Sequence, residues 1–290
     1  MAEGEQPMMT FSDHELRGTW LGRVWRPGIG PAVVTLREGR VIDITSRAAP
    51  TVRDVLEGDA PAAYVASANG EDLGAIRDVA GSADPSAVHW LAPCDLQAVK
   101  ACGVTFAQSM VERVIEEQAA GDPGKAEAIR TRVTAIIGDS LDQIEAGSEK
   151  AAEVKAELIE IGLWSQYLEV GIGPDAEVFS KAQPLSSVGP GAEIGLHPSS
   201  TWNNPEPEVV LAVNSKGTCH GVTLGNDVNL RDIEGRSALL LPMAKDNNAS
   251  CALGPMIRLF DATYSMEDVR QTVLTCALKA KTVTCCKASR

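Results

Sequence analysis

Residues 202–211 read Trp-Asn-Asn-Pro-Glu-Pro-Glu-Val-Val-Leu, a stretch in which two glutamates alternate with two prolines. Side chains two positions apart in an extended segment point to the same face, so Glu206 and Glu208 are expected to lie together. Pro207 between them fixes its own φ and favours an extended conformation at the residue before it. Two carboxylates on one face repel each other unless solvent or a shared cation compensates them, and the pattern alone leaves both interpretations open.

A second acidic motif follows downstream, where residues 225–232 read Gly-Asn-Asp-Val-Asn-Leu-Arg-Asp. Between the two motifs, residues 209–213 and 218–224 are β-prone and flank a turn of Asn-Ser-Lys-Gly, which predicts a hairpin. Pairing of its strands returns Asp227 to the level of the two glutamates. Three carboxylates without a nearby Cys or His ligand suit a hard cation, namely Mg²⁺, Mn²⁺ or Ca²⁺.

The pattern along the rest of the chain predicts an α+β protein. Residues 51–56 and 70–79 are expected to form short helices, and a helical pattern extends from 109 to 162. A meander of short strands is expected near the N-terminus, at residues 20–25, 32–36 and 40–45.

The charge and composition of the chain indicate which classes of binding partner are not expected. The chain has 26 Lys and Arg against 39 Asp and Glu, a net charge of −13, so nucleic acid and anionic membranes are not expected partners. There is no apolar run of the roughly 20 residues that a membrane span needs, and no targeting segment is recognised. Seven cysteines without zinc-site spacing fit a reducing compartment, so we predict a cytoplasmic location. An acidic chain that binds an anion needs a local positive centre.

Taken together, these motifs resemble the fumarylacetoacetate hydrolase superfamily. The resemblance rests on the two-glutamate strand, on the Asn-Asp-Val-x-x-Arg-Asp turn at residues 226–232, and on Lys245 in a Lys-Asp stretch that ends in Gly-Pro. Residues 103–106, Gly-Val-Thr-Phe, together with Glu112 are similar to the opening catalytic motif, and residues 179–182 are similar to the Phe-x-Lys segment.

The resemblance covers roughly residues 99–261 and implies a fold. We expect a small β-rich N-terminal domain over residues 1–95. A catalytic domain with a mixed β-roll and a helical lid segment would follow over residues 96–290, with C-terminal strands missing.

The resemblance also implies roles for individual residues, in a site that binds Mg²⁺ (Mn²⁺ or Ca²⁺ as alternatives) and a small 2-oxo acid. The chain is expected to form a homodimer or a larger homo-oligomer. The implied metal ligands are Glu206, Glu208 and Asp227; the catalytic residues are Lys245 and Glu112; and the substrate-binding residues are Lys181, Thr105 and Phe106.

One departure from the family pattern suggests the reaction. Ser109 stands where the superfamily motif has a histidine, and a serine cannot act as the base that activates water. The pattern is most similar to the 2-keto-3-deoxy sugar-acid dehydratase branch, which implies proton removal at C3, an enolate at the metal and loss of the C4 hydroxyl. Lys245 would handle the C3 proton and Glu112 would protonate the hydroxyl. A C–C hydrolase of acylpyruvate or fumarylacetoacetate-type substrates is the alternative, and an inactive truncated member is another.

The last residues are a second departure. Residues 276–290 hold three of the seven cysteines and four basic residues but no acidic residue, in an otherwise acidic chain. This break in composition suggests an out-of-frame tail, and a frayed natural terminus is the alternative. An out-of-frame tail should not pair with the sheet, should leave Cys285 and Cys286 unburied, and should leave residues 209–211 and 256–259 with exposed apolar faces.

Overall fold

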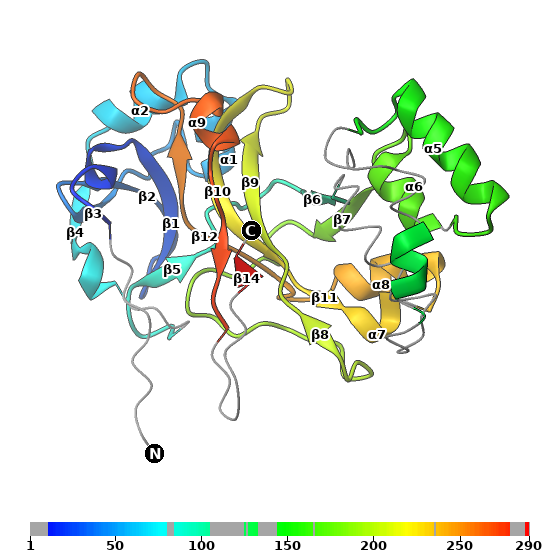
Figure 1. Cartoon of the computed structure of the whole chain (residues 1–290). Helices are drawn as coiled ribbons and strands as arrows, with labels where there is room; N and C mark the ends of the chain where they lie inside the picture. The colour runs from blue at the N-terminus through cyan, green and yellow to red at the C-terminus, as the bar shows by residue number, and fades with distance from the viewer. Residues whose placement is uncertain are drawn as a thin grey trace. The chain divides into compact units, whose positions relative to one another are not determined.

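The structure is a computed structural model, and Figure 1 shows the path of the chain. It describes residues 11–79, 84–104, 125, 127–132, 144–164, 166–234, 236–278 and 288–289. Thr105, Phe106 and Glu112 lie outside these residues, as does much of the predicted lid segment. The chain divides into two compact units, Met1–Val99 with Ser180–Arg290, and Lys100–Phe179.

The first unit is built on an eight-stranded sheet in the order β4-β3-β2-β1-β12-β10-β9, with β5 paired to β1. Its strand pairs are antiparallel, and the predicted α+β class is confirmed. The strands of this sheet are β1 (Trp20–Arg26), β2 (Gly30–Arg37), β3 (Arg40–Asp43), β4 (Glu71–Ala75), β5 (His89–Leu91), β9 (Pro207–Val213), β10 (Cys219–Asp227) and β12 (Cys251–Leu259).

The described residues also contain two-stranded pairs and several helices. Two-stranded pairs are formed by β6 (Val99–Cys102) with β7 (Val178–Ala182), and by β8 (Asn203–Asn204) with β11 (Asn229–Leu230). Among the described residues, helices with defined bounds include α1 (Val52–Glu57), α2 (Pro61–Ser67), α5 (Glu149–Glu160), α6 (Gln166–Ile172), α7 (Arg231–Glu234), α8 (Leu241–Lys245) and α9 (Met266–Arg270), with 3₁₀ turns at Glu15–Arg17, Ile76–Asp78 and Ala238–Leu240.

The predicted N-terminal meander is confirmed as β1, β2 and β3, and it continues directly into the rest of the sheet. Strand β1 pairs with β12, with Trp20 opposite Arg258. Strands from both predicted domains, 1–95 and 96–290, therefore belong to one sheet. The division between residues 95 and 96 stays a prediction.

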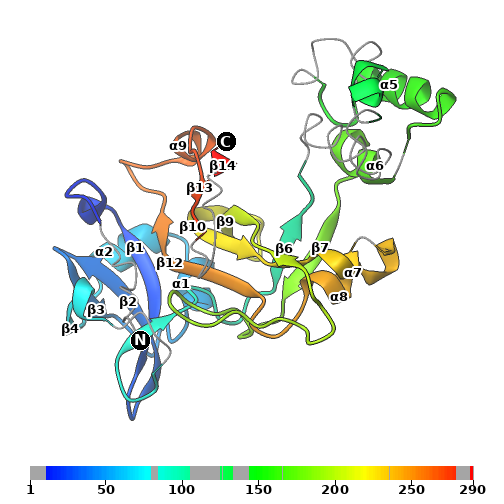
Figure 2. The same ribbon diagram turned by 60° about the horizontal axis from the view of Figure 1, so that its bottom comes forward.

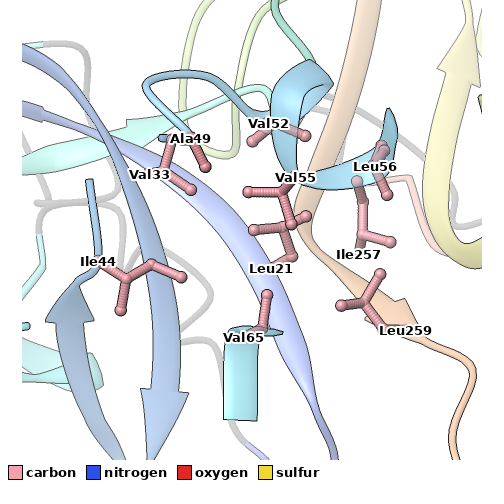
Figure 3. Close-up of a cluster of buried hydrophobic side chains, with 10 residues drawn as sticks. All are labelled: Leu21, Val33, Ile44, Ala49, Val52, Val55, Leu56, Val65, Ile257 and Leu259. Carbon is pink, nitrogen blue, oxygen red and sulfur yellow. The ribbon is translucent and has the colours of Figure 1, made fainter. Parts of the chain in front are cut away.

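Helices α1 and α2 cover the N-terminal part of the sheet and close its core (Figure 3). Thr51 caps the N-terminus of α1, because its side chain accepts a hydrogen bond from the Asp54 amide. Asp95 accepts hydrogen bonds from two further amides of the first turn. Burial of each aliphatic side chain contributes about 1.5–3 kcal/mol. The core cluster comprises Leu21, Val33, Ile44, Ala49, Val52, Val55, Leu56, Val65, Ile257 and Leu259.

The helix predicted at residues 70–79 is wrong. Residues Glu71–Ala75 form strand β4, which pairs with β3, and a single 3₁₀ turn follows at Ile76–Asp78. Gly74 has a φ of 115°, a value that side-chain-bearing residues rarely adopt and that does not occur in a helix. Pairing with a strand distant in sequence outweighed the local pattern here.

The hairpin predicted from the acidic motifs is confirmed as β9 and β10, which Figure 2 shows beside β12. Glu208 lies opposite Gly225, and Asp227 lies opposite Cys251 of β12. The Asp227 amide also donates to the Glu206 carbonyl over 2.8 Å. The hairpin therefore places Asp227 at the level of both glutamates, as predicted.

The second unit contains α5 and α6 and has its own apolar cluster. Ser148 caps the N-terminus of α5, because its hydroxyl accepts a hydrogen bond from the Ala151 amide over 3.1 Å. Val154 and Leu158, spaced one turn apart, are buried on one face of the helix. The full cluster comprises Ile144, Ala151, Val154, Leu158, Leu163, Leu168 and Ile172.

The end of the chain forms a short pair of strands. In it β13 (Thr275–Cys276) pairs with β14 (Ala288–Ser289), so this described part of the tail pairs with itself. Cys285 and Cys286 lie outside the described residues. Leu211 is 47% exposed, as predicted, but β12 is buried from Met256 to Leu259, so its predicted exposure is wrong. The out-of-frame origin of the tail stays a prediction.

Within the described residues, no helix is both long and apolar enough to cross a bilayer.

Candidate metal centre

The three predicted ligands lie at one end of the β9–β10 hairpin. Glu206 directly precedes β9, Glu208 is its second residue, and Asp227 is the last residue of β10. The backbone of Glu206 is held on both sides, because its amide donates to Asn226 Oδ1 over 3.0 Å and its carbonyl accepts from Asp227. Local pairing thus brings carboxylates from two separate motifs to one place.

Lys245, at the end of α8, reaches this acidic group from a different element. Its Nζ lies 2.5 Å from Glu206 Oε2 and 3.2 Å from Asp227 Oδ2, and the side chain is buried. Burial by itself lowers the pKa of Lys245, but the negative charges of Glu206 and Asp227 outweigh it and raise the pKa. Lys245 is therefore a charged ammonium in this arrangement.

Lys181 of β7 forms a second buried ion pair with the same aspartate. Its Nζ lies 3.0 Å from Asp227 Oδ1 and donates to the carbonyl of Val228 over 2.8 Å, to the carbonyl of Lys245 and to Ser250 Oγ over 3.3 Å. The side chain is 1% exposed, and burial lowers its pKa. Lys181 thus connects three segments through its ion pair and hydrogen bonds. Its predicted contact with substrate stays a prediction.

Glu208 lies in a partly buried position beside the other two carboxylates. Burial, followed by the charges of Asp227 and Glu206, raises the pKa of Glu208 to about 7. Burial penalises the charged form of Glu208, and the negative charges of Asp227 and Glu206 add to that penalty. A cation at this position would relieve that repulsion.

The side chains present fit a hard divalent cation. Glu206, Glu208 and Asp227 supply carboxylate oxygens, and two asparagines, Asn204 and Asn229, have buried Oδ1 atoms without a hydrogen-bond partner among the described residues. As the side chains stand, no three His, Cys, Asp or Glu side chains in the described ranges are grouped closely enough to hold a metal ion. The ammonium groups of the two lysines compensate the carboxylates instead, and the metal-ligand set stays a prediction.

The sequence interpretation missed two asparagines. The Nδ2 atoms of Asn204 and Asn229 donate to Glu206 Oε1 over 3.3 and 3.2 Å. The signal that could have revealed them is the density of asparagine in both motifs, at residues 203–204 and 226–229. Thr105, Phe106 and Glu112 lie outside the described residues, so their predicted roles are untested.

Comparisons with known proteins relate this geometry to a chemical class. Over 153 residues the chain is 32% identical to a probable 2-keto-3-deoxyxylonate dehydratase of Haloferax volcanii, an alignment that covers 53% of each chain. Over 81 residues it is 41% identical to the 2-dehydro-3-deoxy-D-arabinonate dehydratase of Saccharolobus solfataricus, covering 28% of this chain and 27% of the relative. The predicted resemblance to the sugar-acid dehydratase branch is confirmed. The matched stretches span about half and about a quarter of these two relatives.

The fold agrees with this resemblance to the sugar-acid dehydratases. The structure matches the apo form of a 2-keto-3-deoxy-D-arabinonate dehydratase with a TM-score of 0.56 at 18% identity, over 93% of this chain and 76% of that one. A hexagonal crystal form of 2-keto-3-deoxyarabinonate dehydratase matches with a TM-score of 0.53 at 21% identity and the same coverage. No family model matches the chain.

Proposed function

We propose that this protein is a divalent-metal-dependent dehydratase of a 2-keto-3-deoxy sugar acid, with a pentonate as the substrate. The observation that carries the proposal is the ion pair of Lys245 with Glu206 and Asp227, since it joins a charged proton carrier to an acidic group suited to a cation. Sequence similarity to two dehydratases supports the choice of reaction.

Glu206, Glu208 and Asp227 would hold the cation, with Mg²⁺ as the first candidate and Mn²⁺ or Ca²⁺ as alternatives. When bound, the cation supplies positive charge next to the carboxylate and keto oxygens of a 2-oxo acid, where negative charge develops during the reaction. When all three carboxylates are ionised, as a cation would require, they and the two ammonium groups of Lys181 and Lys245 sum to a charge of −1 before the cation is counted. A negative centre repels an anion, so we expect an anionic substrate to bind at this centre only when a cation is present.

Lys245 is the proposed proton carrier at C3 of the substrate. Dehydration first breaks the C3–H bond to give an enolate with a C2–C3 double bond. The C2 keto group then re-forms as a C3–C4 double bond forms and the C4–O bond breaks, and the hydroxyl leaves with a proton as water. Because Lys245 is charged as it stands, it must lose a proton before it can accept the one from C3. Glu112 is the proposed donor to the leaving hydroxyl.

We also propose that the substrate is a small 2-oxo acid, that the protein acts in the cytoplasm, and that it assembles as a homodimer or a larger homo-oligomer. The alternative reaction, hydrolysis of a C–C bond, is disfavoured by Ser109 at the position of the motif histidine.

A substrate panel tests the proposed reaction. The purified protein is incubated with 2-keto-3-deoxypentonates, with fumarylacetoacetate and with an acylpyruvate, each with Mg²⁺ or with EDTA. We expect loss of one molecule of water from a pentonate, only when metal is present, and no cleavage of the diketo acids. Cleavage of the diketo acids alone would establish the hydrolase, and the absence of any turnover with Mg²⁺, Mn²⁺ or Ca²⁺ would contradict the assignment as an enzyme.

A further inference from the structure

The Glu206 carboxylate is bound unequally at its two oxygens. Oε1 accepts hydrogen bonds from Asn204 Nδ2 over 3.3 Å and from Asn229 Nδ2 over 3.2 Å, whereas Oε2 faces the ammonium group of Lys245 at 2.5 Å. One oxygen therefore has two neutral donors, and the other faces a positive charge. The carboxylate has a defined orientation before any ligand arrives.

The two asparagines are placed by a dedicated pair of strands. Asn204 of β8 and Asn229 of β11 are directly opposite each other in the antiparallel register, so their side chains emerge on the same face. This two-residue ladder is separate from the large sheet. Its effect is to hold both amide groups against a single carboxylate oxygen.

Hydrogen bonding determines which end of the Asn229 amide faces its two neighbouring carboxylates. Its Nδ2 lies between two carboxylates, 3.2 Å from Glu206 Oε1 and 2.5 Å from Glu234 Oε2, and both can only accept a hydrogen bond when ionised. The amide nitrogen must therefore point to them, which leaves Oδ1 buried without a partner among the described residues. Asn204 has the same orphaned oxygen. A buried acceptor without a donor is unfavourable, so this arrangement is not explained by stability alone.

We propose that Asn204 and Asn229 are positioning residues that fix Glu206 Oε1 and so reserve Oε2 for a divalent cation. This inference rests on the proposed metal site. Oε2 already faces a positive charge, that of Lys245, and a bound cation would compensate the same oxygen. Without the two amides the carboxylate could rotate, and part of the binding free energy would be lost in restoring its orientation.

The test is Mg²⁺ binding to purified variants without substrate, measured by isothermal titration calorimetry. Asn204→Leu and Asn229→Leu each remove one donor at similar side-chain volume, and we expect each to weaken Mg²⁺ binding about 10-fold, with about 100-fold for the double variant. Asn204→Gln keeps an amide donor at a half-buried position and should stay within about threefold of wild type. Asn203→Ala changes the exposed neighbour in the same strand and should leave the affinity unchanged.

Folding is checked by circular dichroism and by the melting temperature of the metal-free proteins. If Asn229→Leu does not fold, the Asn204 variants alone test the positioning role, because Asn204 is only half-buried. Folded leucine variants with wild-type affinity would overturn the positioning role and leave the metal site intact. Equal losses in Asn203→Ala or in Asn204→Gln would also overturn it, because the effect would not follow the amide donor. A wild-type protein that binds no Mg²⁺ would overturn both this inference and the metal site.

Discussion

Replacement of Lys245 with methionine should lower the rate of pentonate dehydration about 100- to 10,000-fold, the usual range for loss of an acid–base group. Methionine has a similar shape but cannot carry a proton. Lys245 Nζ lies within 3.2 Å of two of the three carboxylates, so it is placed to move a proton beside the proposed metal site. The measurement is kcat at saturating Mg²⁺ and substrate.

Mg²⁺ affinity distinguishes this role from a structural one. The ammonium group and a cation compensate the same carboxylates, so we expect that Lys245→Met does not weaken Mg²⁺ binding. Lys216→Met provides a matched control, because Lys216 is exposed and its contact with Asp59 is 3.9 Å long. Unchanged turnover in Lys245→Met would eliminate it as a catalytic residue, and a parallel loss of metal affinity would reassign it to the architecture of the site.

Lys181→Met should have the largest effect on stability. We expect the free energy of unfolding to fall by about 3–5 kcal/mol, the cost typical of removing one partner from a buried ion pair. The ammonium group also donates to main-chain carbonyls of two other segments, and these acceptors would lose their donor. Urea denaturation followed by circular dichroism measures the change.

The same exposed control applies to this stability prediction. Lys216→Met should change the free energy of unfolding by less than about 1 kcal/mol, as is typical for surface ion pairs. A loss as small as this in Lys181→Met would contradict the structural role assigned to Lys181. A rise in KM without loss of stability would support the prediction from the sequence, in which Lys181 contacts the substrate.

The sequence was sufficient where the decisive contacts are local. The β9–β10 hairpin and the proximity of Asp227 to Glu206 follow from strand alternation and a turn between two neighbouring motifs. The resemblance to the sugar-acid dehydratases is also predictable from the sequence, because it depends on residues within these motifs and on Lys245.

The sequence was insufficient where contacts join distant segments. Nothing in residues 20–26 predicts pairing with Arg258, because strand pairing across the length of the chain has no local signal. The same reason explains the error at residues 70–79, where pairing with β3 produced a strand. The two hydrogen bonds of Asn204 and Asn229 to one oxygen likewise depend on the register between two short strands.

The proposed reaction depends most on cation binding, which one measurement tests directly. Mg²⁺ is titrated into wild-type protein and into Asp227→Asn, with the heat of binding recorded by calorimetry and folding confirmed for both. We predict one Mg²⁺ bound per wild-type chain and a loss of at least about 100-fold in affinity for Asp227→Asn, since one of three carboxylate charges is removed. Absence of Mg²⁺ binding to the folded wild-type protein, or equal affinity in Asp227→Asn, would contradict the central claim.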